Sequence, residues 1–151
     1  MEPLLEAWRK NNAANLLLLE HVSDAQLDLD LPKSKSIRGH FAHVVNVRRM
    51  KLKMSGRDLL DTEEKSDRHR ATREALRADM NSTSEAIERL FARIEAPSSK
   101  LKATSVNAAT SMAGLLVHEG SHRGQIEATL RIAGQELPAE VQLVLWDWSK
   151  P

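Results

Sequence analysis

The 151-residue sequence contains no cysteine and no tyrosine, and only three tryptophans and two phenylalanines. Without cysteine the chain forms no disulfide, no thiolate metal site and no cysteine nucleophile. This absence fits a reducing compartment, and we expect a cytoplasmic protein because no signal pattern follows Met1. No apolar run approaches the roughly 20 residues that span a bilayer. Since aromatic residues are scarce, the core must consist of aliphatic residues and Met, which favours helices over sheets.

An excess of charge of one sign is also lacking, because 22 basic residues stand against 21 acidic ones. Nucleic-acid-binding proteins usually have a strong basic excess, so we expect neither a nucleic-acid nor a membrane partner. We interpret the one local basic cluster as a solvated helix face; it consists of Arg48, Arg49, Lys51 and Lys53. The chain length suits one domain, and we take residues 1–151 as a single domain.

Four long segments show the three- and four-residue spacing of apolar side chains that is typical of amphipathic helices. They cover residues 3–22, 36–56, 67–96 and 105–133. Gly56 and Gly134 are suitable C-terminal stops for two of them. These segments predict an all-α fold, a four-helix bundle with crossover connections. A short C-terminal helical tail is expected over residues 139–150, and residues 26–31 alternate polar and apolar as in a strand-like turn.

The strongest chemical signal is the stretch H-E-G-S-H-R-G-Q at residues 118–125. A helix places His118 and His122 on one face, with their Cβ atoms about 5 to 6 Å apart. Both rings can then reach one metal ion at about 2.0 to 2.1 Å. They fall on the apolar stripe between Leu115 and Ile126, where an unpartnered polar ring is costly. The pair alone is compatible with two metal ligands or with hydrogen-bonded core histidines.

A third histidine, His43, lies on the inward side of the segment 36–56. If this helix packs against the segment 105–133, His43 completes a three-histidine site. Such a site leaves coordination positions open for water or substrate, as in catalytic metal sites. We expect His40 to be buried and hydrogen-bonded, with a fourth ligand as the alternative. His21 and His69 are interpreted as surface residues.

The same stretch matches H-E-x-x-H, the motif of zinc proteases in which the glutamate is the general base. Glu119 would hold that position here. The longer protease signature fails, because Gly124 comes one position early, no third histidine follows, and no strand is predicted. A metal-dependent hydrolase of this kind is therefore the less favoured alternative. For Glu119 two roles remain open: a catalytic proton acceptor or orienting group near the metal, or an exposed helix carboxylate.

Two histidine motifs resemble those of DinB-like proteins, the DinB/YfiT superfamily. Residues 36–48, S-I-R-G-H-F-A-H-V-V-N-V-R, resemble its first motif, and residues 118–125 resemble its second, H-x-x-x-H-R-G-Q. The end of the chain, L-P-A-E-V followed by L-W-D-W, is also similar. The resemblance covers about the whole chain. It implies a four-helix bundle with a crossover, a metal triad at His43, His118 and His122, and a homodimer.

The resemblance also implies a divalent metal ion, which in relatives is zinc, nickel, iron or manganese. Characterised relatives include transferases and isomerases that use a small external thiol such as bacillithiol or mycothiol. We therefore expect a metal-dependent enzyme acting on a small electrophile, for example a thiol-dependent S-transferase. A non-enzymatic metal-binding stress-response bundle is the alternative.

Other residues are expected to support the site or the dimer. Asn12 and Asn15 lie on or beside the inner face of the first helix. Arg123 of the second motif either binds an anionic group of the substrate or fixes its helix to a neighbour. The dimer interface is expected at the tail with Trp146 and Trp148, or at the apolar face of the first helix.

Overall fold

The structure, a computed structural model, describes residues 2–95 and 108–149, and within these ranges it contains helices and connections but no strand. The helices are α1 (Glu2–His21), α2 (Asp24–Leu27), α3 (Ile37–Ser55), the 3-10 helix η1 (Arg57–Leu59), α4 (Arg73–Glu95), α5 (Ala108–Ile132) and α6 (Ala139–Trp146). The predicted all-helical class is confirmed. Among the described residues, every helix is too short or too polar to cross a bilayer.

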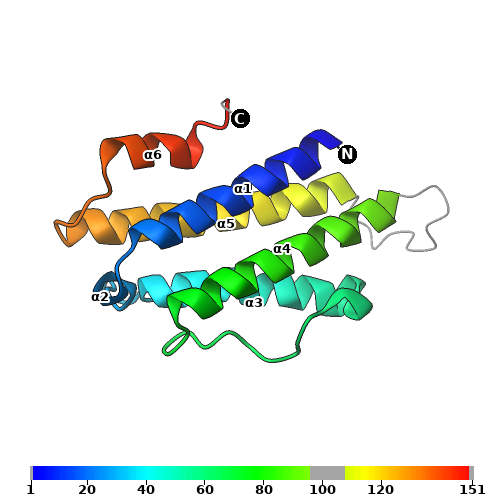
Figure 1. The fold of residues 1–151 in the computed structure, drawn as a ribbon, viewed down its shortest axis with the longest axis horizontal. Coiled ribbons are helices and arrows are strands. Elements are labelled where there is room, and N and C mark those ends of the chain that lie inside the picture. Colours follow the sequence, from blue (N-terminus) through cyan, green and yellow to red (C-terminus); the bar gives the residue numbers. More distant parts are fainter. Residues whose placement is uncertain (1, 96–107, 150–151) are drawn as a thin grey trace.

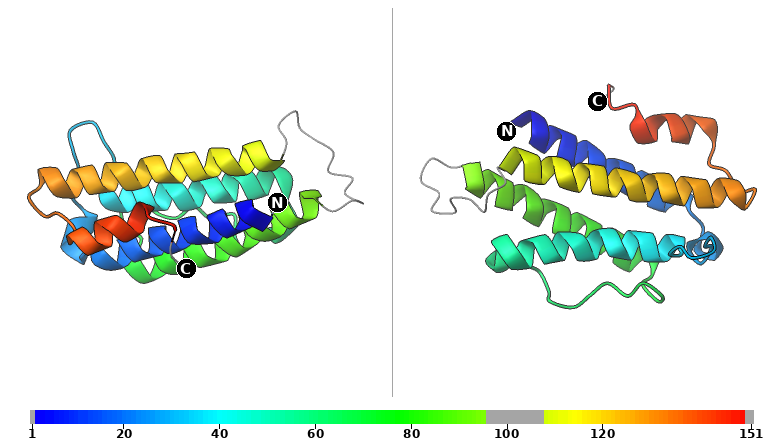
Figure 2. Two further views of the ribbon diagram at one scale, coloured as in Figure 1. Left: turned by 90° about the horizontal axis from the view of Figure 1, so that it is seen from above. Right: turned by 180° about the vertical axis from the view of Figure 1, so that it is seen from behind.

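The four long helices, α1, α3, α4 and α5, lie side by side (Figures 1 and 2). Both α1 and α3 pack against α4 and against α5. Their facing sides are buried and mainly aliphatic, as the apolar stripes predict, and they also enclose Trp8, Phe41 and Phe91. The inward positions of α3 and α5 consequently face each other, which places the predicted histidines on adjoining surfaces.

Two local predictions about secondary structure are wrong. Residues 26–31 do not form a strand-like turn, because the reciprocal hydrogen bonds between Ser23 and Gln26 form a capping box that starts the short helix α2. Helix α4 begins at Arg73 rather than near residue 67. The Asp67 carboxylate accepts hydrogen bonds from two following backbone N–H groups and stabilises a turn there, and the Thr72 hydroxyl caps the helix instead. The predicted boundaries at residues 96 and 105 lie outside the described residues.

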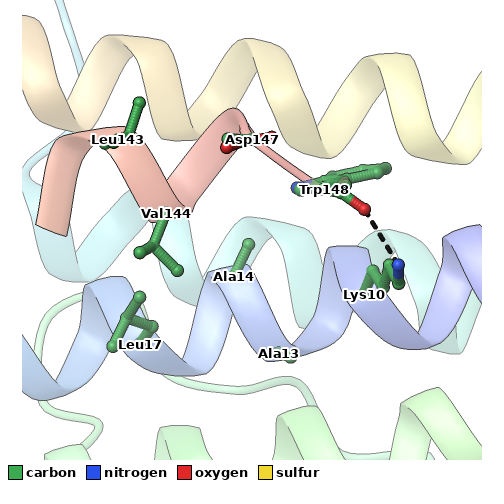
Figure 3. Close-up of a pocket in the computed structure, with 8 residues that line it drawn as sticks. All are labelled: Lys10, Ala13, Ala14, Leu17, Leu143, Val144, Asp147 and Trp148. Atoms are coloured by element: carbon green, nitrogen blue, oxygen red, sulfur yellow. Dashed lines mark hydrogen bonds between the residues drawn. The ribbon is translucent and has the colours of Figure 1, made fainter. Parts of the chain in front are cut away.

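The tail helix α6 lies along α1, and an apolar groove of about 480 Å³ separates their facing side chains (Figure 3). Lys10 of α1 closes one end by donating to the carbonyl oxygen of Trp148 at 2.8 Å. Trp146 of α6 is 72% exposed. No histidine lines this groove, so it is separate from the histidine cluster.

Candidate metal centre

Three histidine rings from two helices converge beside the core. His43 comes from α3, and His118 and His122 come from successive turns of α5. The ring centroids are 5.3 Å apart for His43 and His118, 4.9 Å for His43 and His122, and 4.6 Å for His118 and His122. One nitrogen of each ring lies within 4.8 Å of the others. The structure therefore brings together the three residues that the motifs predict as metal ligands.

The geometry of this cluster fits a divalent metal ion. The Nε2 atoms of His118 and His122 are 3.2 Å apart. Two nitrogens bound to one tetrahedral ion at about 2.0 to 2.1 Å are about 3.3 to 3.4 Å apart, so little movement is needed. The Nδ1 atom of His118 is buried and has no hydrogen-bond partner among the described residues. Coordination through Nε2 would leave this Nδ1 as it is, so the fit to an ion rests on the spacing of the Nε2 atoms.

His40, which precedes His43 by one helical turn, contacts His122 on the side of the ring away from His118. It is only 1% exposed, and its Nδ1 lies 2.9 Å from Nδ1 of His122. Its Nε2 lies 3.4 Å from the Ser34 hydroxyl. The prediction that His40 is buried and hydrogen-bonded is confirmed. The ring of His122 is thus held through one nitrogen while its other nitrogen faces His118.

Burial keeps these histidines neutral. It is the main cause that lowers the pKa of His122 to about 3 and that of His40 to about 4. Burial is also the main cause that lowers the pKa of His43 and of His118. Neutral imidazole is the form that binds metal ions, so the free protein presents its ligands ready for coordination at neutral pH.

We expect the metal-free protein to lose stability as the pH falls below about 6.5. Histidines of the unfolded chain titrate near 6.5, whereas His122 and His40 titrate near 3 and 4 when folded. Between these values the unfolded chain binds protons that the folded chain does not, so stability rises with pH. The stabilisation is complete above pH 6.5 and is lost as the pH falls toward 4, by up to about 1.4 kcal/mol per pH unit for each histidine.

Urea unfolding in the presence of a chelator, at three pH values between 7 and 5, measures this loss. The His69→Gln variant is the matched control, because His69 is exposed and lies outside the cluster. This control should keep the pH dependence of the wild type. A free energy of unfolding that stays constant from pH 7 to pH 5 would contradict the burial of neutral histidines.

A buried arginine joins the helices that carry the cluster. The guanidinium of Arg48 on α3 donates through Nε and Nη2 to the two carboxylate oxygens of Glu119 on α5, each at 2.7 Å. Its Nη1 donates to the Asn12 side chain of α1 and to the Met80 carbonyl of α4, both at 2.9 Å. The guanidinium also lies 4.7 Å from the ring centre of Trp8. One side chain therefore contacts all four long helices.

This finding corrects the interpretation of the basic cluster as a solvated helix face. Arg48 is fully buried and Arg49 is only 8% exposed, whereas Lys53 is exposed as expected. The signal was present in the sequence, because Arg48 lies on the same helical row as Phe41 and Leu52, seven residues before it and four after it. Because arginine is rarely buried, the residue type argued against the inward position that the spacing of Arg48 indicates.

Glu119 is neither exposed nor directed to solvent, since it is only 1% exposed. Besides the two bonds from Arg48, its Oε2 accepts bonds from the side-chain amides of Asn11 at 2.6 Å and Asn15 at 2.7 Å. The expectation of an exposed helix carboxylate is therefore wrong. Because both oxygens are engaged by these donors, the geometry favours a positioning role for Glu119 over the catalytic role as proton acceptor.

The same two asparagines connect α1 to Arg123. The Arg123 guanidinium donates to the side-chain oxygen of Asn11 at 2.6 Å and of Asn15 at 2.8 Å. Each asparagine amide thus bridges the Glu119 carboxylate and the Arg123 guanidinium, which are four residues apart on α5. Of the two roles expected for Arg123, the structure shows the second, which is to fix its helix to a neighbour. Asn11, which the sequence patterns did not single out, belongs to this network.

A cavity of about 530 Å³ lies beside His43, one member of the cluster. His43 and Gly39 of α3 belong to its lining, together with residues of the connection between α3 and α4. His43 is thus both a member of the triad and part of a wall open to small molecules. Unlike the groove at α6, this cavity is lined by a histidine.

An all-helical chain with three histidine rings gathered from two helices defines a candidate three-histidine metalloprotein. The model of the DinB family matches residues 1–148, and the chain belongs to this family. No curated protein and no solved structure matches the chain. Family membership and the possible metal site were both anticipated by the two histidine motifs.

Proposed function

We propose that the protein is a divalent-metal-dependent enzyme that promotes attack of a small nucleophile on a small electrophile. His43, His118 and His122 would hold the ion. A divalent ion on three neutral imidazoles lowers the pKa of a water or thiol that it binds, so that a nucleophile is available near neutral pH. The chain has no thiol of its own, and a thiol substrate would therefore be external.

The observation that carries the proposal is the position of His43, which belongs to the triad and also lines the cavity. Three protein ligands leave room in the coordination sphere, as in catalytic zinc sites, whereas structural sites are closed by four. The cavity volume of about 530 Å³ lies in the range of small-molecule sites. A metal site that only stabilises the fold has no need of such an opening.

The protein residues around the triad would orient and insulate it. The Nδ1 of His122 faces His40, whose other nitrogen faces the Ser34 hydroxyl. If His122 ligates through Nε2, its Nδ1 carries a proton and donates it to His40, and His40 then donates from Nε2 to Ser34. This chain fixes the tautomer of the ligand, a role that outer partners of metal-bound histidines commonly have. Burial of His40 also excludes water from that side.

For a thiol-dependent transfer, sulfur would form a bond to the electrophilic carbon. The leaving group would depart with its bonding electron pair, and the thiol proton would go to solvent. This balance requires no oxidant and no thiol from the chain. A protease-type hydrolase is less well supported, because the Glu119 carboxylate already accepts bonds from Arg48, Asn11 and Asn15.

Three further features belong to the proposal. We infer a four-helix bundle with a crossover, because α1 packs mainly on α4 and α5 rather than on α3, the next long helix. A homodimer is proposed at α6, whose Val144 and Trp146 are exposed. A cytoplasmic location, which the absence of cysteine favours, stays a prediction.

The proposal is tested with protein purified without a histidine tag and loaded with zinc, nickel, iron or manganese in turn. We expect one metal per chain, and a metal-dependent acceleration when a small thiol is mixed with a chromogenic chloronitrobenzene. Chelation and His122→Ala should both abolish the acceleration, whereas His69→Ala should retain it. Stoichiometric metal binding with no acceleration over a panel of thiols and electrophiles would instead favour the non-enzymatic metal-binding bundle.

A further inference from the structure

The cavity beside His43 has an uneven distribution of charge. Its lining contains five cationic side chains and two acidic ones. Two of the cations are neutralised within the protein. Arg49 pairs with Asp61 and Asp79, and Lys53 pairs with Glu63 at 3.2 Å.

The other three cations, Lys35, Lys65 and Arg68, are exposed and have no carboxylate partner among the described residues. Arg68 donates through its Nε to Nε2 of His69 at 2.9 Å, and this contact supplies no negative charge to compensate the guanidinium. Glu64 is the one acidic residue of the lining without a basic partner among the described residues. The rim of the cavity therefore carries an excess of positive charge, although the whole chain is nearly neutral.

Lys35 lies close to the histidine cluster. It immediately precedes the N-cap of α3, and a Cβ atom added to Gly39 would lie 3.3 Å from the Cβ of Lys35 and 3.8 Å from the carbonyl oxygen of Arg68. The absence of a side chain at Gly39 thus lets the Lys35 segment approach α3 one turn before His43, and the Arg68 backbone lies within van der Waals distance of the same position. After burial, the charge of Lys35 is a further cause that lowers the pKa of His43 and His40.

The cavity also offers apolar surface. Val47 and Met50 of α3 lie on its wall one and two turns after His43, and Leu60 lies opposite on the connection to α4. Met50 is 55% exposed and available to a ligand. Apolar side chains with a few placed charges are typical of small-molecule sites. The lining thus matches a ligand with an apolar body and a negative group.

We propose that this cavity binds a small organic acid, with Lys35, Lys65 and Arg68 holding its anionic group and Val47, Met50 and Leu60 contacting its apolar body. The inference rests on the proposed function and names its substrate class, because the bound acid lies next to His43. The three cations are specificity-determining residues, since they select the charge of the substrate. Neutral analogues of the same shape bind less well.

The experiment compares benzoate with benzamide, which have similar shapes and different charges. Calorimetry or NMR titration of the metal-free protein measures both affinities, so that direct coordination of the carboxylate to a metal does not contribute. We expect benzoate to bind about tenfold more tightly than benzamide, as three partly exposed charge pairs would allow. The preference should weaken as salt is added.

The triple variant Lys35→Gln, Lys65→Gln, Arg68→Gln should lose the preference for benzoate and keep the affinity for benzamide. Lys51→Gln is the matched control, because Lys51 lies on α3 outside the cavity lining and its removal changes net charge only. Retained benzamide binding and helix content show that the triple variant is folded. Three outcomes would each overturn the inference. The wild type could bind both ligands equally well, it could show no detectable benzoate binding, or the triple variant could keep the preference for benzoate.

Zinc binding, measured on the same samples, separates this inference from the proposed function. If the protein binds zinc but shows no preference for benzoate, the proposed metal site stands and the organic-acid inference fails. If it binds no metal but prefers benzoate, the organic-acid site stands and the enzyme proposal fails.

Discussion

The His122→Ala variant is expected to lose its bound metal, with affinity reduced on the order of 100-fold or more. His122 occupies the centre of the cluster, because its ring lies within 5.1 Å of those of His40, His43 and His118. Its removal takes away one of the three proposed ligands and also the hydrogen-bond partner of His40. Elemental analysis of tag-free protein and a competition titration with a chromogenic chelator measure the change.

Two further variants give the metal affinities with which that of His122→Ala is compared. His40→Ala removes an outer partner and leaves all three ligands, so metal affinity should fall about 10- to 100-fold. His69→Ala removes an exposed histidine and should change nothing. Equal metal content in wild type and His122→Ala would refute the triad, and a loss in His40→Ala as large as in His122→Ala would instead make His40 a ligand.

The Arg48→Met variant is expected to be destabilised by about 3 to 5 kcal/mol. Arg48 and Glu119 are 0% and 1% exposed, so removal of the guanidinium leaves a buried carboxylate without its charged partner. The asparagine bonds to Glu119 remain and compensate only part of that loss. The Asn12 side-chain oxygen and the Met80 carbonyl would also lose their donor. Urea unfolding measures the free energy.

A double variant and an exposed pair serve as controls for Arg48. Arg48→Met combined with Glu119→Gln should be less destabilised than the sum of the single variants, because no unpaired charge is then buried. Arg57→Met breaks the exposed pair with Glu63 and should cost less than about 1 kcal/mol. A cost for Arg48→Met as small as that for Arg57→Met would contradict the central role of the buried pair.

The pair also has a consequence for the metal centre. Arg48 follows His43 by five residues on α3, and Glu119 follows His118 by one residue on α5. Because the pair joins the two helices that carry the proposed ligands, its loss should lower metal affinity even in the fraction that remains folded. Lys53→Met, which breaks an exposed pair on the same helix, should leave the metal affinity unchanged.

The sequence by itself determined the helical class, the inward faces of the long helices and the candidate ligands. These properties depend on spacing along the chain: His118 and His122 share a face because they are four residues apart on a helix, and the motifs identified His43. The spacing also indicates that Arg48 faces inward, since it lies on the same helical row as Phe41 and Leu52.

Only the tertiary structure decided the environment of the charged residues and the shape of the site. Burial of Arg48 and Glu119 is favourable only because each meets the other across two helices, and spacing along one helix does not reveal a partner on another. The cavity at His43 likewise forms between α3 and a connection whose path depends on local turns, such as the one at Asp67. Periodicity defines which face of a helix turns inward, whereas packing decides what that face meets.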